Sequence, residues 1–338
     1  MTDAIELVPA RALLVPRPRI RLELQPGDRV TAMVGDVVRA GEVVAERIRD
    51  PRLVEAPVPR AGVDQGTPLP GTWLPGEHAR AGRRVGAPAG ELLFEHGGRR
   101  RLATGPHPDR LHAPADGYVL EVEAGVALVL QIDGPGLVAT ELLGEPHSGR
   151  LIVMPEDADP RIVLDVALAG AVIVLQGRVD AEALARARAM GIHGAVVGSL
   201  ADRERRDLAA SSARQQAGLH RLAPFGALVL GGYLRRPLSA AVRAVLDAAS
   251  GSVVGLVGDP PLLLIPADRE LPLPEPDRVV VRGGLEAGSE GRWLGPAGIR
   301  RLRGGITAET GLVALDDGRT LAIPIGELER FAVPVSSG

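Results

Sequence analysis

The sequence predicts a multi-domain protein that combines all-β parts with one α/β part. Glycine and proline, 43 and 29 of the 338 residues, separate short apolar runs, and composition changes at residues 144–161 and at the proline-rich 266–278. Only the middle of the chain alternates apolar strands with helical patterns. Turn residues between apolar runs are typical of β structure, and the alternation is typical of α/β domains. We therefore predict domains at residues 1–148, 149–268 and 277–338.

Composition excludes several kinds of chemistry. All 39 basic residues are arginine, and cysteine and asparagine are also absent. Without lysine the chain has no Walker A motif and no attachment point for lipoate, biotin or pyridoxal phosphate. Without cysteine it has no disulfide, thiol nucleophile, iron–sulfur cluster or cysteine-ligated zinc. For these reasons we expect no cofactor. A G-x-S-x-G nucleophile motif is absent as well, and we assign no catalytic residue.

The amino terminus and the apolar runs bear on location. The first ten residues, MTDAIELVPA, contain acids and no basic region of the kind that begins a signal peptide. The longest uncharged stretches, near 166–177 and 222–234, are shorter than the 18 or so residues that span a bilayer. We expect a soluble, cytoplasmic protein with no membrane partner.

Two stretches of the first segment follow a hairpin pattern, at residues 27–45 (GDRVTAMVGDVVRAGEVVA) and 112–122 (HAPADGYVLEV), and residues 76–82 and 88–94 partly repeat it. Each glycine permits a tight turn, and the alternating valines face a core. The pattern resembles the biotin/lipoyl-like barrel-sandwich hybrid, most closely the amino-terminal part of RnfC-type electron-transport proteins. This resemblance implies a lipoyl-like β sandwich. The chain lacks the modified lysine and the cluster cysteines of those families, and this absence favours a structural or docking role for the fold.

The middle segment predicts a small, doubly wound, Rossmann-like α/β domain. Its apolar runs are continuous, which indicates a sheet buried on both faces. Strands are expected at 171–176, 194–198, 226–231, 252–257 and 262–265, and helices at 180–190, 200–217 and 238–249.

Glycines at the ends of these strands form a candidate ligand site. In an open α/β sheet, ligands bind beyond the carboxyl ends of the strands, where helix amino termini offer free N–H groups. A small anionic metabolite could bind there, although loops of this kind need glycine whether or not anything binds. No G-x-G-x-x-G motif follows any strand. The candidate ligand-binding residues are Gly177, Gly198, Ser199, Gly231, Gly232, Tyr233, Gly258 and Asp259.

The third segment ends in two alternating strands around Asp317-Gly318, a strong hairpin signal. With the Trp293 region and the closing strand it resembles an SH3-like barrel of the KOW type, which implies a possible RNA contact through Arg300, Arg301 and Arg303. Residues 277–338 hold eight arginines and eight acids, so the basic excess that drives nucleic-acid binding is missing. A solvated or protein-facing patch is the favoured alternative.

A short histidine-containing stretch, GPHPDRLHAPADG, is a candidate metal site. His107, Asp109 and His112 could converge on one ion. Flanking prolines predict a stiff, exposed loop, in which solvated histidines are the more common case. We place His193 in a turn at the end of the sheet away from any ligand.

These observations leave three functional hypotheses. The leading one is a non-catalytic scaffold or accessory protein that binds another protein. The second is an enzyme or sensor that holds a small anionic metabolite at the strand ends. The third is RNA binding through the carboxyl-terminal barrel, and nucleic acid is the least favoured partner. The whole chain also resembles bacterial multi-domain proteins with this domain order, which implies no activity and leaves the oligomeric state open.

Overall fold

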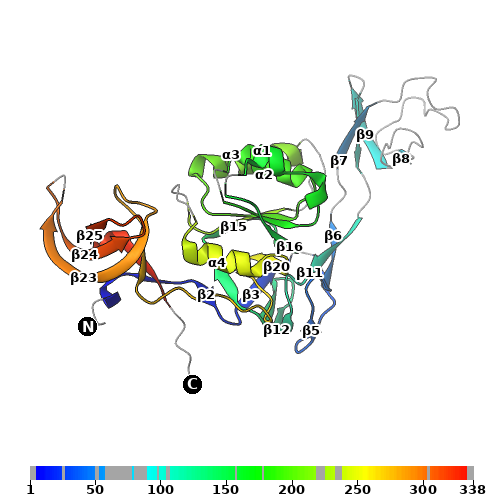
Figure 1. Cartoon of the computed structure of the whole chain (residues 1–338). Coiled ribbons are helices and arrows are strands. Elements are labelled where there is room, and N and C mark those ends of the chain that lie inside the picture. The colour runs from blue at the N-terminus through cyan, green and yellow to red at the C-terminus, as the bar shows by residue number, and fades with distance from the viewer. Residues whose placement is uncertain are drawn as a thin grey trace.

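The computed structural model (Figure 1) is mostly β-sheet. It describes residues 5–24, 27–49, 53–57, 78–79, 90–96, 99–103, 107–156, 158–176, 179–217, 225–232, 238–302 and 305–332.

A nine-stranded mixed sheet forms the centre of the molecule. Four strands, β16 to β19, are parallel and lie in consecutive order, and five antiparallel strands extend them at both sides. The order is β15 (Glu141–Gly144), β19 (Gly226–Val229), β18 (Gly194–Val197), β17 (Val172–Leu175), β16 (His147–Val153), β20 (Val253–Gly258), β21 (Pro261–Leu264), β14 (Gly136–Val138) and β2 (Leu14–Val15).

Helices cover both faces of the parallel strands. On one face lie α1 (Pro160–Val163), α2 (Ala181–Ala189) and α3 (Asp202–Ala217), and on the other lies α4 (Ala240–Ala249) (Figure 1). Every residue of β17, β18 and β19 is buried. The predicted burial on both faces is thus confirmed, and so are the predicted strands and helices of this segment, to within two residues.

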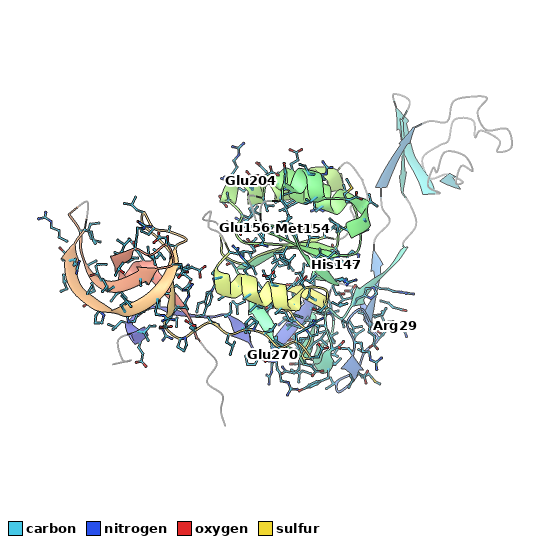
Figure 2. The ribbon with its side chains drawn as sticks, viewed as in Figure 1. Arg29, His147, Met154, Glu156, Glu204 and Glu270 are labelled. Carbon is cyan, nitrogen blue, oxygen red and sulfur yellow. The ribbon has the colours of Figure 1, made fainter. Side chains whose placement is uncertain are left out.

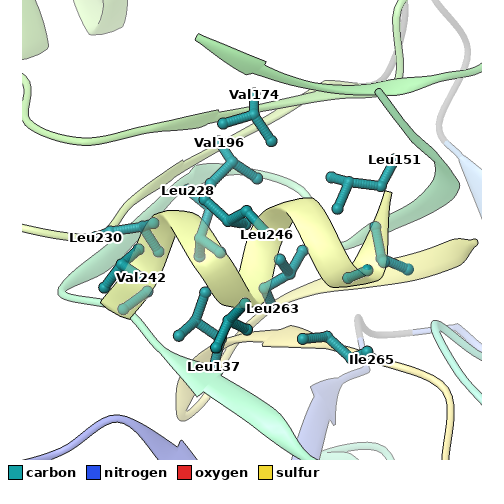
Figure 3. Packing of buried hydrophobic residues seen from close by; sticks show 14 of the residues in the cluster. Leu137, Leu151, Val174, Val196, Leu228, Leu230, Val242, Leu246, Leu263 and Ile265 are labelled. Atoms are coloured by element: carbon teal, nitrogen blue, oxygen red, sulfur yellow. The ribbon is translucent and has the colours of Figure 1, made fainter. Parts of the chain in front are cut away.

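Helix α4 fills the space between the parallel and antiparallel halves of the central sheet. Figure 3 shows Leu246 and Val242 of α4 with Val174, Val196 and Leu228 above the helix and Leu137, Leu263 and Ile265 below it. All these side chains are buried. Full burial of an aliphatic side chain contributes about 1.5–3 kcal/mol, so this cluster joins the two halves into one core.

Two sheets precede the α/β part, and we call them the N-terminal sheets. One has the order β3 (Arg19–Glu23), β13 (Ala127–Ile132), β12 (Gly117–Glu123), β5 (Val37–Val38), and the other has β11 (His107–His112), β6 (Val43–Arg49), β4 (Arg29–Val30). Their shared core includes Val257, Leu262 and Leu264 from β20 and β21. A further sheet lies beyond β6 and contains β7 (Leu53–Pro57), β10 (Arg99–Ala103), β9 (Gly90–His96) and β8 (His78–Ala79).

The C-terminal sheet has six strands and its own core around Trp293 and Val313. Gly318 has φ +87° and joins two antiparallel strands, which confirms the predicted hairpin. The order is β1 (Ala10–Ala12), β26 (Leu328–Ala332), β22 (Arg278–Val281), β23 (Glu290–Arg301), β24 (Thr307–Leu315) and β25 (Thr320–Pro324).

Sheet pairing crosses the predicted domain boundaries. The first fifteen residues supply β1 to the C-terminal sheet and β2 to the central sheet, and β14 and β15 also join the central sheet. Of the strands predicted for the parallel sheet, β17, β18 and β19 are parallel, whereas β20 and β21 are antiparallel, and the fourth parallel strand, β16, is not among the predicted ones. The additional strands pair backbone groups that would otherwise be left at a sheet edge. Among the residues that the structure describes, no helix is long and apolar enough to cross a membrane.

Candidate functional site

The predicted ligand residues lie at the two opposite ends of the parallel strands β16–β19. We call these two sides of the central sheet the carboxyl-end edge and the amino-end edge. Gly198, Ser199, Gly231 and Gly232 follow parallel strands and share the carboxyl-end edge. Gly177 and Tyr233 lie outside the described residues.

Gly258 and Asp259 do not join that group. Gly258 is the last residue of β20 and Asp259 follows it, and β20 runs antiparallel to β16 and pairs Leu256 with His147. The end of β20 therefore lies at the amino-end edge of the parallel strands. Figure 2 makes the two edges visible, because His147 and Met154 lie at opposite ends of β16. The grouping of all eight residues in one crevice is wrong, because sequence periodicity does not reveal strand direction.

At the carboxyl-end edge, the glycines make close backbone contacts with one another. The Gly231 N–H donates to the Gly198 carbonyl over 2.7 Å, and the Leu200 N–H donates to the Gly232 carbonyl over 3.1 Å. A Cβ added at Gly231 would lie only 2.8 Å from the Gly198 oxygen. Close approach of two loops therefore accounts for glycine at position 231 without a ligand.

The amino terminus of α2 is satisfied by carboxylates of the protein itself. Asp180 accepts from the Ala183 N–H over 2.8 Å, and Glu204 accepts from the Ala181 N–H over 3.1 Å. Unpaired N–H groups and the helix dipole make such a terminus attractive to an anion. Here the chain supplies that negative charge.

The amino terminus of α4 is filled from the C-terminal sheet. Glu290 of β23 accepts from the Ala240 N–H over 2.7 Å, and Ser239 accepts from the Val242 N–H over 3.3 Å. Burial raises the pKa of the Glu290 carboxyl above its ordinary value, while the Ala240 hydrogen bond and the Arg278 guanidinium oppose this shift. A carboxylate from a distant segment thus occupies the place where a ligand anion would bind.

The amino-end edge opens into a cleft of about 760 Å³ between the central and N-terminal sheets. Its lining includes strands β3 and β11, the end of β15, the start of β16 and the end of β20. Three histidines contribute to it, His112, His147 and His193, together with the carboxylates of Glu145 and Asp259. Asp259, one of the predicted ligand residues, therefore lines a cleft, but not the predicted one.

Two of these histidines are oriented by backbone carbonyls. His193 Nδ1 lies 2.9 Å from the Ser148 oxygen, and His112 Nδ1 lies 2.8 Å from the Gly41 oxygen. A carbonyl only accepts, so Nδ1 carries the proton in both rings and Nε2 is the remaining ring nitrogen. The His147 and His193 ring centroids are 5.4 Å apart, with planes tilted by 35°.

Sequence reasoning missed this group of histidines. It assigned His193 to the end of the sheet away from a ligand and gave His147 no role. The two meet because β16 extends beyond the start of β17: Leu151 pairs with Val172, so that residues 147 and 148 project past β17 toward the turn before β18. Strand register creates this contact, and no spacing in the sequence reports it.

The predicted metal residues occupy strand β11, so the prediction of a stiff loop is wrong. His112 lines the cleft, whereas the side chains of His107 and Asp109 lie outside the described part of the chain. Within the part of the chain that the structure describes, no group of three His, Asp or Glu side chains is arranged to hold a metal ion.

The predicted arginine cluster lies at the end of the β23–β24 hairpin. Arg300 pairs with Ala308 and Arg301 pairs with Thr307. Successive residues of a strand point to opposite faces, so these two arginines do not form one surface for a phosphate backbone. Arg303 lies outside the described residues.

No family model matches the chain, and no curated protein matches it.

Proposed function

We propose that this chain is a non-catalytic, cytoplasmic scaffold or accessory protein in which a lipoyl-like β domain and an SH3-like barrel flank an α/β core. Its partner is another protein. The observation that carries this proposal is the exposed end of the β23–β24 hairpin, residues 298–302 and 305–309, which we call the arm. Figure 1 shows the arm on the side of the C-terminal sheet that faces away from the central sheet.

The arm exposes large apolar side chains that its own sheet does not cover. Thr310, which donates to the Gly298 carbonyl over 2.8 Å, is the last buried residue of β24 toward the arm. Beyond it, Ile299 is 70% exposed and Ile306 is 68% exposed. Exposed apolar side chains beside charged ones are typical of a protein-binding surface.

One face of the arm joins an apolar side chain to an arginine. Ile299 and Arg301 share this face, because they are two residues apart on β23, and Arg300 points to the other. Arginine with an aliphatic neighbour suits a protein partner whose apolar groove has an acidic rim. The opposed arginines and the equal numbers of acids and arginines in residues 277–338 give RNA less support.

The small-metabolite alternative at the carboxyl-end edge has weaker support. The chain's own carboxylates bind the amino termini of α2 and α4, and loop contacts account for Gly231. An incoming anion would have to displace Glu290 or Asp180. These contacts favour a structural role for that edge, in agreement with a scaffold.

A photo-crosslinking amino acid at position 299 tests the arm directly in cells of the source organism. We expect a discrete covalent adduct with one protein, whose yield Ile306→Ser lowers at least about fivefold, because interface anchors typically contribute more than about 1 kcal/mol each. The matched control is Leu285→Ser, which changes a side chain that is 88% exposed in the loop between β22 and β23, outside the arm. No adduct, or equal loss in both variants, would contradict the proposal.

A further inference from the structure

The cleft between the central and N-terminal sheets has no use in the proposed scaffold role. It lies at the amino-end edge of the parallel strands, whereas the arm belongs to the C-terminal sheet. Its polar lining consists of three histidines, three acidic residues, two arginines and one serine. The cleft is therefore separate from the surface that would bind a protein partner.

The charges around the cleft favour a cation over an anion. Glu145, Asp259 and Glu23 contribute carboxylates to the lining. The lining also contains Arg21 and Arg110, and Arg21 is already bound to Glu123, with 2.8 Å between Nη2 and Oε2. The three acidic residues outnumber the two arginines, so the lining would attract a metal ion more than a phosphate or carboxylate ligand.

The histidine tautomers point to the same ligand class. A metal-binding histidine commonly donates its second ring N–H to a carbonyl, which fixes the ring and leaves the other nitrogen as the ligand. His193 has this arrangement through the Ser148 carbonyl. Imidazole suits Zn²⁺, Cu²⁺ and Ni²⁺, whereas Mg²⁺ and Ca²⁺ prefer oxygen ligands.

The separation of the His147 and His193 rings allows both to bind one ion. With Zn–N bonds of about 2.0–2.1 Å and tetrahedral angles, the centres of two coordinating imidazoles lie about 5 Å apart. The observed centroid separation is 5.4 Å. We propose that His147 and His193 bind one divalent transition-metal ion, and that water or a small ligand in the cleft completes its coordination. Two protein ligands are consistent with the absence of a three-residue metal group among the described residues.

Zinc titration of the full chain tests this site. After treatment with a chelator, competition with a chromophoric zinc indicator should reveal one saturable site per chain. His193→Ala should weaken it at least about tenfold, because one of only two protein ligands is lost. His112→Ala, which removes an imidazole from the same cleft but not from the pair, should change the affinity less than about twofold. His193 and His112 are both exposed, so the two variants are matched for effects on folding.

Copper gives a second readout that does not depend on affinity. Cu²⁺ bound to the wild type should show electron paramagnetic resonance couplings to two imidazole nitrogens, and His147→Ala and His193→Ala should each show one. Circular dichroism of each variant separates loss of the site from loss of the fold. The proposal is overturned if zinc does not saturate one site, if His193→Ala binds as tightly as the wild type, or if His112→Ala loses as much affinity.

Discussion

The two edges of the parallel strands β16–β19 differ in what covers them. At the carboxyl-end edge, glycine loops contact each other and side-chain carboxylates cap α2 and α4. At the amino-end edge, the N-terminal sheets leave a cleft of about 760 Å³ with three histidines. Ligands of open α/β sheets ordinarily bind at the first edge. Segments added to a sheet can thus close its usual binding edge and create a cleft at the other.

Antiparallel strands are the cause of this difference. Because β20 returns antiparallel to β16, its end and the following Asp259 reach the amino-end edge. The N-terminal sheets pack there, and the C-terminal sheet delivers Glu290 to the start of α4. A segment distant in sequence thus covers each edge. Substitutions at each edge test whether these contacts stabilise the fold.

Gly255→Ala should have the largest effect, because it affects the contact that holds the amino-end edge against the N-terminal sheets. A Cβ at Gly255 would lie 2.3 Å from the Pro114 carbonyl oxygen, and both partners are buried backbone. Forced overpacking of this kind costs typically 1–3 kcal/mol, and we expect about 3 kcal/mol here. The midpoint of urea unfolding measures the loss.

Gly258→Ala is the matched control on the same strand. Its added Cβ would lie 3.5 Å from Leu142 side-chain atoms, an ordinary contact at an exposed position. We expect the free energy of unfolding to change by less than about 0.5 kcal/mol. Equal effects of the two substitutions would show that the Pro114 contact does not hold the N-terminal sheets in place.

Gly231→Ala tests whether the carboxyl-end edge is closed by backbone contact. The new Cβ would lie 2.8 Å from the Gly198 oxygen, so the loop must shift, and we expect a loss of about 1–2 kcal/mol in the ligand-free protein. Thermal unfolding in buffer without phosphate measures it. Unchanged stability, together with stabilisation of the wild type by an added anionic metabolite, would instead identify an open ligand site.

Glu290→Gln should have the smallest effect and a defined pH dependence. Because burial raises the pKa of Glu290 in the folded protein, protonation of this carboxyl favours folding. The stability of the wild type relative to the variant should be greatest below the ordinary glutamate pKa and should fall as pH rises through the raised pKa. Since solvent reaches part of the carboxyl, we expect the change to stay below about 1 kcal/mol.

Urea unfolding of both proteins between pH 4 and 8 measures this difference. Glutamine can still accept from the Ala240 N–H, so the variant retains the helix contact without the titrating group. A difference that grows with rising pH would mean that Glu290 is stabilised as an anion at α4, and the carboxyl-end edge would then favour negative charge more than the structure indicates.

Local sequence patterns determined the elements of this protein. Continuous apolar runs specified buried strands such as β17 and β19, helical periodicity specified α2 and α4, and Asp317-Gly318 specified a hairpin, because each depends on neighbouring residues. The absence of lysine, cysteine and asparagine likewise restricted the chemistry with no knowledge of structure.

Only the tertiary structure decided which edge of the sheet is open. The separation of Asp259 from Gly231, the meeting of His147 with His193 and the reach of Glu290 to α4 all depend on strand direction and register between distant segments. Hydrogen bonding between strands sets direction and register, and sequence periodicity is the same for a strand that runs either way. Local sequence patterns therefore specify the strands, whereas pairing between distant segments specifies the cleft.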